Sequence, residues 1–409
     1  MKQNAGICAA VAVLVVLAAA VTAGCVGSSG PAPLSGTVSH GDITEVADYL
    51  YEVSYDDYDE TNMMENAQYM ANLFVTSKYL AELLEDDAFW EEFFENAMIP
   101  PSACSSVHNG DYFGRNFDYT YSDASSIVVH VPASDKRYAS VGVAGSVILW
   151  TPEYIEALMT DEDFALLPFA TLDGINEKGV GINSNVAPVY DLEKPTTGTN
   201  PGKMNLPMEF VPRYVLDHAA SAKEAVDLLS ACSLVAMNGC PEGLELHWLI
   251  CDSTESYIVE CINNEMKAVN GDVMTNYYLT TDSPTPHSMG IERYNILTEN
   301  IAEAVSVDGM DSLMQRAQYT KMYDPKTTPR RYSELYLEIP EMEIDITIDS
   351  PDESKQAILD YVSEMYLSAE RKPNNSIWQT LHSSIYDLKN LTLRLHVQEN
   401  YEKSFEYHL

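Results

Sequence analysis

The sequence is poor in positive charge. Lysine and arginine together number 23, whereas aspartate and glutamate number 62, which gives a formal net charge of −39. Nucleic acids and anionic membrane surfaces would repel such a chain, so the composition argues strongly against both as partners. An acidic surface favours solubility but says nothing specific about a substrate.

Closely spaced cysteine pairs are also absent. The seven cysteines include no C-x-x-C pair, which disfavours a zinc site or a thioredoxin-like motif. We expect no metal and no organic cofactor. Outside the cell, Cys232 and Cys240 could close a small disulfide loop. Cys251 and Cys261 fall at opposite ends of an expected hairpin, a poor geometry for bridging, and we interpret them as buried free thiols.

A long apolar run occurs only at the N-terminus. Residues 1–25 contain Lys2, the run ICAAVAVLVVLAAAVTA and then AGC, which is short for a spanning helix and typical of a secretory signal. The stretch TAGC resembles a lipoprotein processing box, so lipid attachment at Cys25, simple export and an uncleaved anchor all stay open. We expect an exported, extracellular or cell-surface protein that meets a membrane only through Cys25. Residues 26–40 read as a flexible tether.

Residues 41–99 lack proline and contain one glycine, at their start. Apolar residues recur there at helical spacing, which predicts one or two amphipathic helices; they are Leu73, Phe74, Tyr79, Leu80, Leu83 and Leu84. Pro100 and Pro101 end the pattern and leave a short loop. We therefore expect 41–103 to be a helical propeptide or small subunit, followed by the main domain at 104–409.

The stretch Cys104–Asp118, CSSVHNGDYFGRNFD, predicts a hairpin. Asn109-Gly110 suits a two-residue type I′ turn, in which both central residues need a positive φ. Counting outward from that turn sets Cys104 opposite Arg115. An arginine beside a thiol favours the thiolate, which indicates a reactive cysteine.

From residue 104 the pattern is mostly strands, with helices inserted. Residues 169–185 read as two strands around a turn in which Gly179 supplies the left-handed position, and 207–231 read as two helices, the second capped by Ser221. Residues 245–278 predict an antiparallel meander, and Lys389-Asn390 a C-terminal hairpin. Strand sets without regular βαβ alternation favour an α+β fold with antiparallel sheets.

Four short motifs occur in order along this domain: Cys104-Ser-Ser, GRNFD at 114–118, DGINEKG at 173–179 and MTN at 274–276. Together they resemble the choloylglycine hydrolase family, the linear-amide C–N hydrolases that include bile salt hydrolases and penicillin V acylases. The resemblance implies an N-terminal nucleophile (Ntn) hydrolase with a four-layer αββα sandwich at 104–409. It also implies an amidase whose partner is a small N-acylated molecule; a homo-oligomer stays open.

The resemblance assigns a role to six positions. Cys104 is implied as nucleophile, with Arg115 and Asp118 as the charged pair beside it. The backbone N–H of Asn185 and the side chain of Asn276 are implied as donors to the oxyanion. Arg293 matches a second active-site arginine. Without the resemblance, these residues would read as a buried small hydrophobe, a cross-strand ion pair, two strand-ending asparagines and a surface cation.

The sequence departs from the family pattern at its front, where a long extension separates Cys25 from Cys104. That layout is more similar to acid ceramidase, in which internal cleavage yields two subunits. Because an internal Cys104 has no α-amino group to act as base, the mechanism requires scission at Ala103–Cys104. His108, His247 and His287 show no orienting residue, which disfavours a papain-like pair. An N-acyltransferase and a non-catalytic amphiphile-binding lipoprotein remain alternatives.

Overall fold

The structure of the chain is a computed structural model. It describes residues 38–58, 104–119, 124–145, 152–157, 159, 164–165, 167–187, 200–235, 245–262, 264–280, 289–318, 335–338, 370–373 and 379–409. The leader with Cys25, the helical pattern at 73–84, the peptide bond before Cys104, and Cys240 therefore lie outside the described residues.

The larger sheet has ten strands in the order β1-β3-β6-β7-β8-β9-β12-β13-β14, with β2 paired to β3. Every neighbouring pair is antiparallel except β3 and β6. Its strands are β1 (Ser39–His40), β2 (Thr44–Ala47), β3 (Leu50–Asp57), β6 (Ser126–Val131), β7 (Ser140–Gly145), β8 (Thr171–Asn176), β9 (Gly181–Ala187), β12 (Glu245–Cys251), β13 (Ser256–Ile262) and β14 (Glu265–Asn270).

The smaller sheet has six antiparallel strands in the order β15-β4-β5-β18-β19-β20. They are β15 (Val273–Met274), β4 (Ser105–Asn109), β5 (Tyr112–Tyr119), β18 (Gln379–Asp387), β19 (Thr392–Val397) and β20 (Phe405–His408). Two short ribbons stand apart from both sheets: the parallel pair β10 (Met204–Pro207) and β11 (Cys232–Val235), and the antiparallel pair β16 (Leu335–Glu338) and β17 (Glu370–Pro373).

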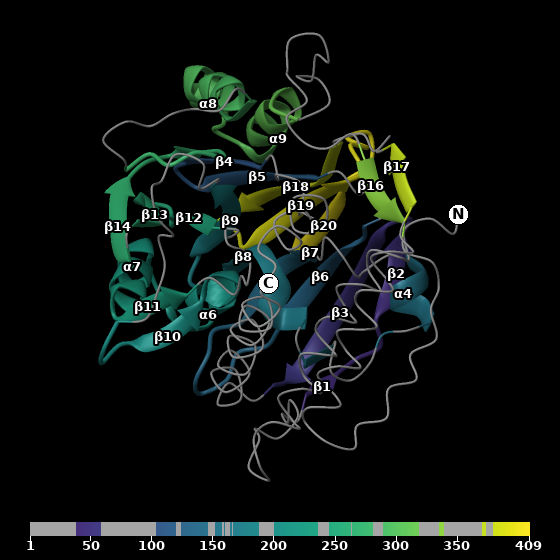
Figure 1. Cartoon of the computed structure of the whole chain (residues 1–409), viewed down its shortest axis with the longest axis horizontal. Helices are drawn as coiled ribbons and strands as arrows, with labels where there is room; N and C mark the ends of the chain where they lie inside the picture. Colours follow the sequence, from purple (N-terminus) through teal and green to yellow (C-terminus); the bar gives the residue numbers. More distant parts are fainter. Residues whose placement is uncertain are drawn as a thin grey trace.

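Helices cover the outer face of each sheet (Figure 1). On the larger sheet lie α6 (Val211–His218) and α7 (Ala222–Ser230), and on the smaller one α8 (Met289–Asn300) and α9 (Val307–Arg316). The remaining pieces are α4 (Pro152–Ala157) and the 3₁₀ turns η1 (Leu167–Ala170), η3 (Met208–Phe210) and η4 (Ile301–Glu303). The layers are therefore helix, sheet, sheet, helix, and the expected αββα sandwich of the α+β class is confirmed.

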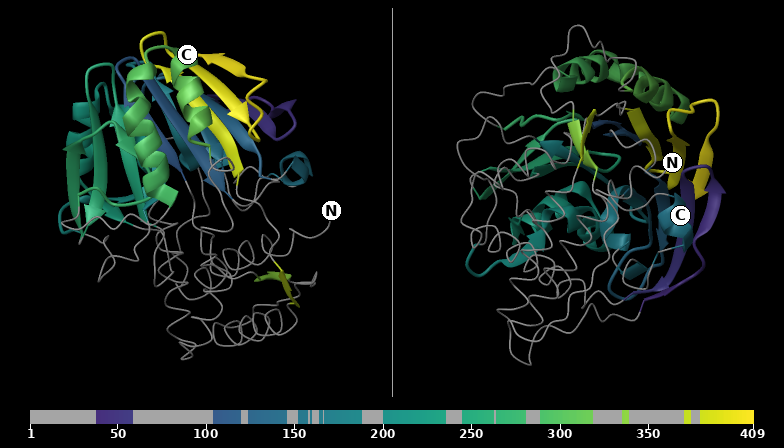
Figure 2. Two further views of the ribbon diagram at one scale, coloured as in Figure 1. Left: turned by 90° about the horizontal axis from the view of Figure 1, so that it is seen from above. Right: turned by 45° about the vertical axis from the view of Figure 1, so that its right-hand side comes forward.

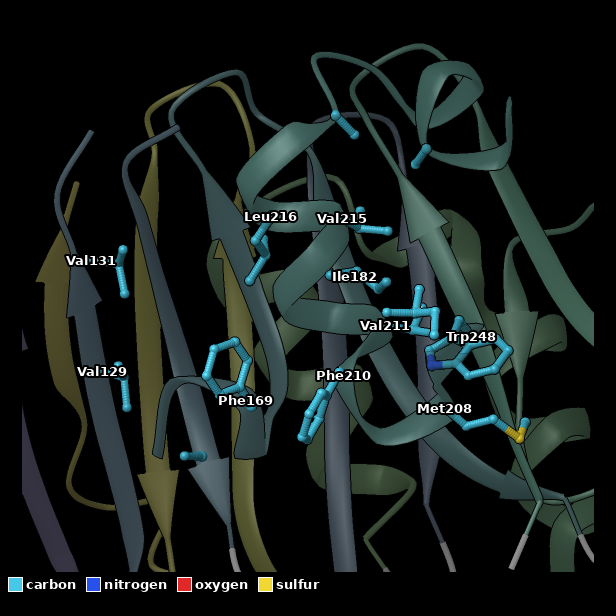
Figure 3. Packing of buried hydrophobic residues seen from close by; sticks show 14 of the residues in the cluster. Val129, Val131, Phe169, Ile182, Met208, Phe210, Val211, Val215, Leu216 and Trp248 are labelled. Atoms are coloured by element: carbon cyan, nitrogen blue, oxygen red, sulfur yellow. The ribbon is translucent and has the colours of Figure 1, made fainter. Parts of the chain in front are cut away.

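Two apolar cores hold the layers together. Between α6 and the larger sheet, Val211, Val215 and Leu216 face Ile182 and Trp248 (Figure 3). Between the two sheets, Phe113 and Tyr386 from the smaller sheet stack with ring centroids 5.4 Å apart and pack in one cluster with side chains of the larger sheet. Burial of aromatic and branched side chains on both inner faces fixes the spacing of the sheets.

Several local signals were predicted correctly from the sequence. Gly179 has a φ of +78° in the turn between β8 and β9, as predicted for a left-handed position. The Ser221 side chain accepts the Glu224 N–H and caps α7, and α6 ends at His218, with Ala219 as its C-cap. The meander β12–β13–β14 and the β18–β19 hairpin are also confirmed.

The helical prediction for residues 41–99 is wrong over Thr44–Asp57, which form β2 and β3. Tyr51, Val53 and Tyr55 are buried and alternate with more exposed polar residues, a two-residue period that only a strand can present to one core. The purple N-terminal strands lie along one edge of the fold in both panels of Figure 2. The boundary expected at Cys104 is therefore not a structural boundary, because β3 is part of the larger sheet.

The segment that follows β3 is also anchored to the main domain. The Arg137 guanidinium donates to the Tyr58 carbonyl oxygen at 2.9 Å and lies over the Tyr58 ring, 4.3 Å from its centroid. The Tyr58 hydroxyl donates to the buried Asp217 carboxylate on α6. Residues 50–58 are thus bound to the main domain by both backbone and side-chain contacts.

The hairpin of β4 and β5 forms with a register two residues away from the predicted one. Ser106, and not Cys104, pairs with Arg115, since the turn is centred on Gly110-Asp111, and only Gly110 has a positive φ, +62°. That pattern matches a type II′ turn rather than type I′. A shift of two residues keeps every side chain on its predicted face, so Cys104 and Arg115 still share one.

Candidate active site

Cys104 lies immediately before β4, and its side chain is buried, with 1% exposure. The Arg115 Nη2 donates to its Sγ at 3.8 Å, reaching diagonally across the hairpin from the position opposite Ser106. The Arg293 Nη1 donates to the Cys104 carbonyl oxygen at 2.7 Å. Two guanidinium groups, one from a strand and one from α8, therefore converge on this cysteine.

Arg115 is held from behind by two residues that the sequence analysis did not single out. Its Nη1 lies 2.9 Å from Asp173 Oδ1 and 2.7 Å from His382 Nε2, and all three side chains are fully buried. Burial alone would raise the pKa of Asp173, but Arg115 and His382 outweigh it and hold the pKa at about 2. Since the Asp173 carboxylate stays ionised, it fixes the position of Arg115 and offsets its charge.

The thiol is not activated in the uncut chain. Burial raises the pKa of the Cys104 thiol above its ordinary value, although Arg115 acts in the opposite direction. The predicted shift toward the thiolate is therefore wrong in its net direction for this state, because desolvation disfavours the charged sulfur more than one neutralised arginine favours it.

Asp118, Arg293 and Asn276 form the second half of the site. The Arg293 Nη1 donates to Asp118 Oδ2 at 3.1 Å, and its Nη2 donates to Asn276 Oδ1 at 2.9 Å. Thr380 donates to the other Asp118 oxygen at 2.6 Å. Arg115 and Asp118 are three residues apart on β5 and so point to opposite faces of the strand. Arg115 approaches the thiol, whereas Asp118 lies with Arg293 beside the backbone of Cys104.

The burial of Asp118 predicts that the free energy of unfolding of the protein depends on pH. Burial raises the pKa of its carboxyl to about 7, with Arg293 opposing the shift. Since the folded chain then binds this proton more tightly than the unfolded chain, the contribution to the free energy of unfolding is full below pH 4 and is lost as the pH rises to about 7. We expect urea unfolding to show a loss on the order of 4 kcal/mol over that interval, absent from Asp118→Asn. Both proteins should carry Cys104→Ala to stay uncut; equal pH slopes would contradict the assignment.

The two asparagines predicted at the oxyanion site occupy different positions. Asn276 Nδ2 donates to the Val186 carbonyl oxygen at 2.7 Å, and its amide lies beside Arg293 at the edge of the site. The Asn185 side chain instead bonds Ser106 Oγ at 3.1 Å and accepts from Asn183 at 2.8 Å, between the sheets. The structure thus brings Asn276 into the cluster with Cys104 and places the Asn185 side chain in a neighbouring polar cluster.

A comparison with protein-family models shows the family of this chain. Residues 104–322, more than half of the chain, match the model described as linear amide C–N hydrolases, choloylglycine hydrolase family. The chain belongs to this family. The match begins at Cys104 and includes all six predicted site residues.

Individual relatives in the family are distant. The chain is 29% identical over 185 residues to a penicillin V acylase of Pectobacterium atrosepticum, covering 44% of this chain and 47% of that protein. It is 28% identical over 178 residues to a bile salt hydrolase/transferase of Lactiplantibacillus plantarum, covering 40% and 48%. The chain thus spans about half the length of the curated relatives it matches.

Solved structures of the family are also similar to this chain. A variant of the conjugated bile acid hydrolase from Clostridium perfringens matches with a TM-score of 0.39 and 17% identity, covering 75% of this chain and 92% of that one. The penicillin V acylase from Agrobacterium tumefaciens matches with a TM-score of 0.37 and 17% identity, covering 75% and 86%.

One cavity of this family member lies away from Cys104. It has a volume of about 380 Å³ beside the β10–β11 ribbon, and its lining includes Lys203, Cys232 and Cys261 but none of the six site residues. Cys232, Cys251 and Cys261 are buried, and none of them forms a disulfide with another described residue, as predicted for the last two. Within the described ranges, no group of three or more His, Cys, Asp or Glu side chains could hold a metal ion, and no helix is long and apolar enough to cross a membrane.

Proposed function

We propose that this chain is an exported Ntn amidohydrolase that cleaves the linear C–N amide bond of an N-acylated small molecule. The observation that carries the proposal is the convergence of the Cys104 thiol, Arg115 and the linked group Asp118–Arg293–Asn276 at one end of the β4–β5 hairpin. These groups supply a nucleophile, charged side chains beside it and an amide N–H donor. Acyl transfer requires groups of these kinds.

Scission of Ala103–Cys104 would start the chemistry. It frees an α-amino group with a pKa of about 8, which can take the thiol proton at neutral pH and later return it to the leaving amine. Continuing the β4–β5 register sets Cys104 opposite Phe117, which supports the neighbouring Asp118 as the acceptor of a hydrogen bond from this amine. Scission also removes a backbone constraint on a thiol that is buried in the uncut chain.

The remaining groups act on the acyl transfer itself. The thiolate attacks the substrate carbonyl carbon, the C–N bond breaks as the amine leaves with a proton, and water hydrolyses the resulting thioester. The amide of Asn276 has two N–H donors, one of which binds the Val186 carbonyl oxygen. The other would donate to the developing oxyanion without a turn of the side chain, with the backbone N–H at Asn185 as the second donor. Each donor contributes roughly 3–4 kcal/mol to lowering the barrier. Arg115 stabilises the thiolate that forms.

The substrate class we propose spans bile-acid conjugates, N-acyl amino acids, fatty amides and penicillin-type side chains. The relatives named as penicillin V acylase and bile salt hydrolase/transferase support an amide with a bulky apolar acyl group. We further propose an extracellular or cell-surface location with Cys25 as a lipid anchor. The net charge of −39 disfavours nucleic acid as a partner.

Intact-mass and N-terminal analysis of purified protein tests the proposal. We expect a chain beginning at Cys104, accompanied by a second fragment that contains residues 50–58 and stays bound through gel filtration, because β3 pairs with β6. The fragments should separate only in denaturant. The cut protein should release free acid and amine from a panel of N-acyl amides. An uncut, inactive protein would instead favour the non-catalytic amphiphile-binding lipoprotein.

An N-acyltransferase using the same thioester is the second candidate, because one relative is named hydrolase/transferase. Addition of millimolar glycine or taurine to the amidase assay separates the two. New N-acyl conjugates formed in preference to free acid would identify a transferase.

A further inference from the structure

A buried histidine and a buried glutamate lie under the loop that carries Asn276. His247 on β12 and Glu260 on β13 come from neighbouring strands of the larger sheet, and both side chains are fully buried. The His247 Nδ1 lies 3.3 Å from Glu260 Oε1, and its Nε2 lies 2.6 Å from the Thr275 carbonyl oxygen. The sequence offered no orienting partner for His247; the structure gives it one, and corrects that interpretation.

The two ring nitrogens of His247 face different groups. A backbone carbonyl oxygen only accepts, so Nε2 donates to Thr275. Nδ1 faces the Glu260 carboxylate. Among the described residues, no hydrogen bond joins His247 to the Cys104 thiol, so the structure gives no support for a papain-like base at this position.

Glu260 holds the other end of the same loop. Its oxygens accept the backbone N–H of Leu279 at 2.8 Å and of Thr280 at 2.9 Å, and the Thr280 hydroxyl at 2.5 Å. Burial would raise the pKa of this carboxyl, but the hydrogen bonds from His247 and Thr280 outweigh it and lower the pKa. One buried pair of side chains thus ties down both ends of residues 275–280.

The loop fixed in this way is the one that presents Asn276. From inside the loop, Thr275 Oγ1 also donates to the Gly290 carbonyl oxygen at 2.9 Å, at the start of the helix that carries Arg293. In addition, His247 pairs across the ladder with Asn185, next to the Val186 carbonyl that receives the Asn276 amide. The hydrogen bond from His247 to Thr275 and its pairing with Asn185 therefore connect it to both proposed oxyanion donors.

We propose that His247 and Glu260 are positioning residues that hold the Asn276 amide in place for the oxyanion. This inference rests on the proposed amidase function. A donor fixed before the substrate arrives needs no reorganisation when charge develops, and a donor on a loose loop loses that advantage. The pair acts through Asn276 and does not touch the substrate.

Kinetics of Glu260→Gln and His247→Gln on any amide that the wild type cleaves test this role. We expect kcat to fall by about 10- to 100-fold while KM changes by less than about threefold. His396→Gln is the matched control, because His396 is also buried between a carboxylate, Asp311 at 3.0 Å, and a carbonyl, Lys403 at 2.9 Å, but on β19. Its kcat should stay within about twofold of wild type.

A double-mutant cycle identifies Asn276 as the mediator. In an Asn276→Ala background, Glu260→Gln should reduce kcat by less than about threefold, because the donor that it positions is already gone. A further loss as large as in the wild-type background would overturn the inference.

Amide hydrogen exchange provides a readout that needs no turnover. Glu260→Gln should speed exchange at Leu279 and Thr280 by about tenfold or more, whereas His396→Gln should leave it unchanged. Unchanged exchange in Glu260→Gln overturns the inference even if the amidase proposal holds. A wild type that cleaves no amide would defeat the proposed function, and the exchange result would still decide whether this pair fixes the loop.

Discussion

Replacement of Cys104 by alanine is expected to leave the chain uncut and to abolish amide turnover, with kcat lower by about four to six orders of magnitude. The thiol is the nucleophile in both reactions that we propose, and no other described thiol lies among the site residues. The measurement is intact mass for scission and product release for turnover. The folded state should survive, because removing one sulfur atom at a strand start leaves the contacts of Arg115 with Asp173 and His382 in place.

Cys251→Ala is the matched control. Cys251 is equally buried but lies on β12 in the core between the sheets, so its loss should affect stability slightly and leave scission and turnover near wild type. Normal turnover by Cys104→Ala would remove the basis of the proposed mechanism. Turnover without scission in the wild type would show instead that the thiol works without a free α-amine.

Val53→Asp is expected to prevent folding of the whole protein, including residues 104–409. Val53 is 1% exposed at the centre of β3, where it pairs with Val129 of β6. A carboxylate there would be buried without a partner, which costs several kcal/mol against a typical total stability of 5–15 kcal/mol. We expect insoluble protein or a lost cooperative unfolding transition by circular dichroism.

Ser54→Asp, one residue further along, separates burial from position. Ser54 is exposed on the opposite face of β3, so the same carboxylate should change the melting temperature by only a few degrees. If Val53→Asp folded and stayed as stable as Ser54→Asp, then β3 would be a dispensable propeptide segment and not a structural strand.

How well the site could be predicted from the sequence depends on how far apart in the chain the interacting residues lie. Cys104 and Arg115 could be placed on one face because they share a hairpin, and that relation survived a register error of two residues. Asp173 and His382, which contact Arg115, lie 58 and 267 residues away from it in the sequence. No local pattern encodes such a pairing. Asp173 had two signals: it is the first residue of the DGINEKG motif, and it is a charged residue in an otherwise apolar strand.

The N-terminal strand was missed for a different reason. The helical spacing at residues 73–84 led to a helical prediction for the whole of residues 41–99. The earlier part of that range has its own pattern, because Tyr51, Val53 and Tyr55 alternate with a period of two. Considered separately, the segment Leu50–Asp57 would have favoured a strand. The pairing of β3 with β6 could not be inferred, since it is parallel and joins segments on either side of Cys104.

Because of that parallel pairing, a form of this protein cut before Cys104 would refold differently from the continuous chain. While the chain is continuous, β3 finds β6 at the effective concentration set by the connecting polypeptide, and refolding is a unimolecular process. After a cut before Cys104, the same encounter becomes bimolecular, and the yield of renatured protein would depend on total protein concentration. The mature form would then persist through the slowness of its unfolding more than through its equilibrium stability.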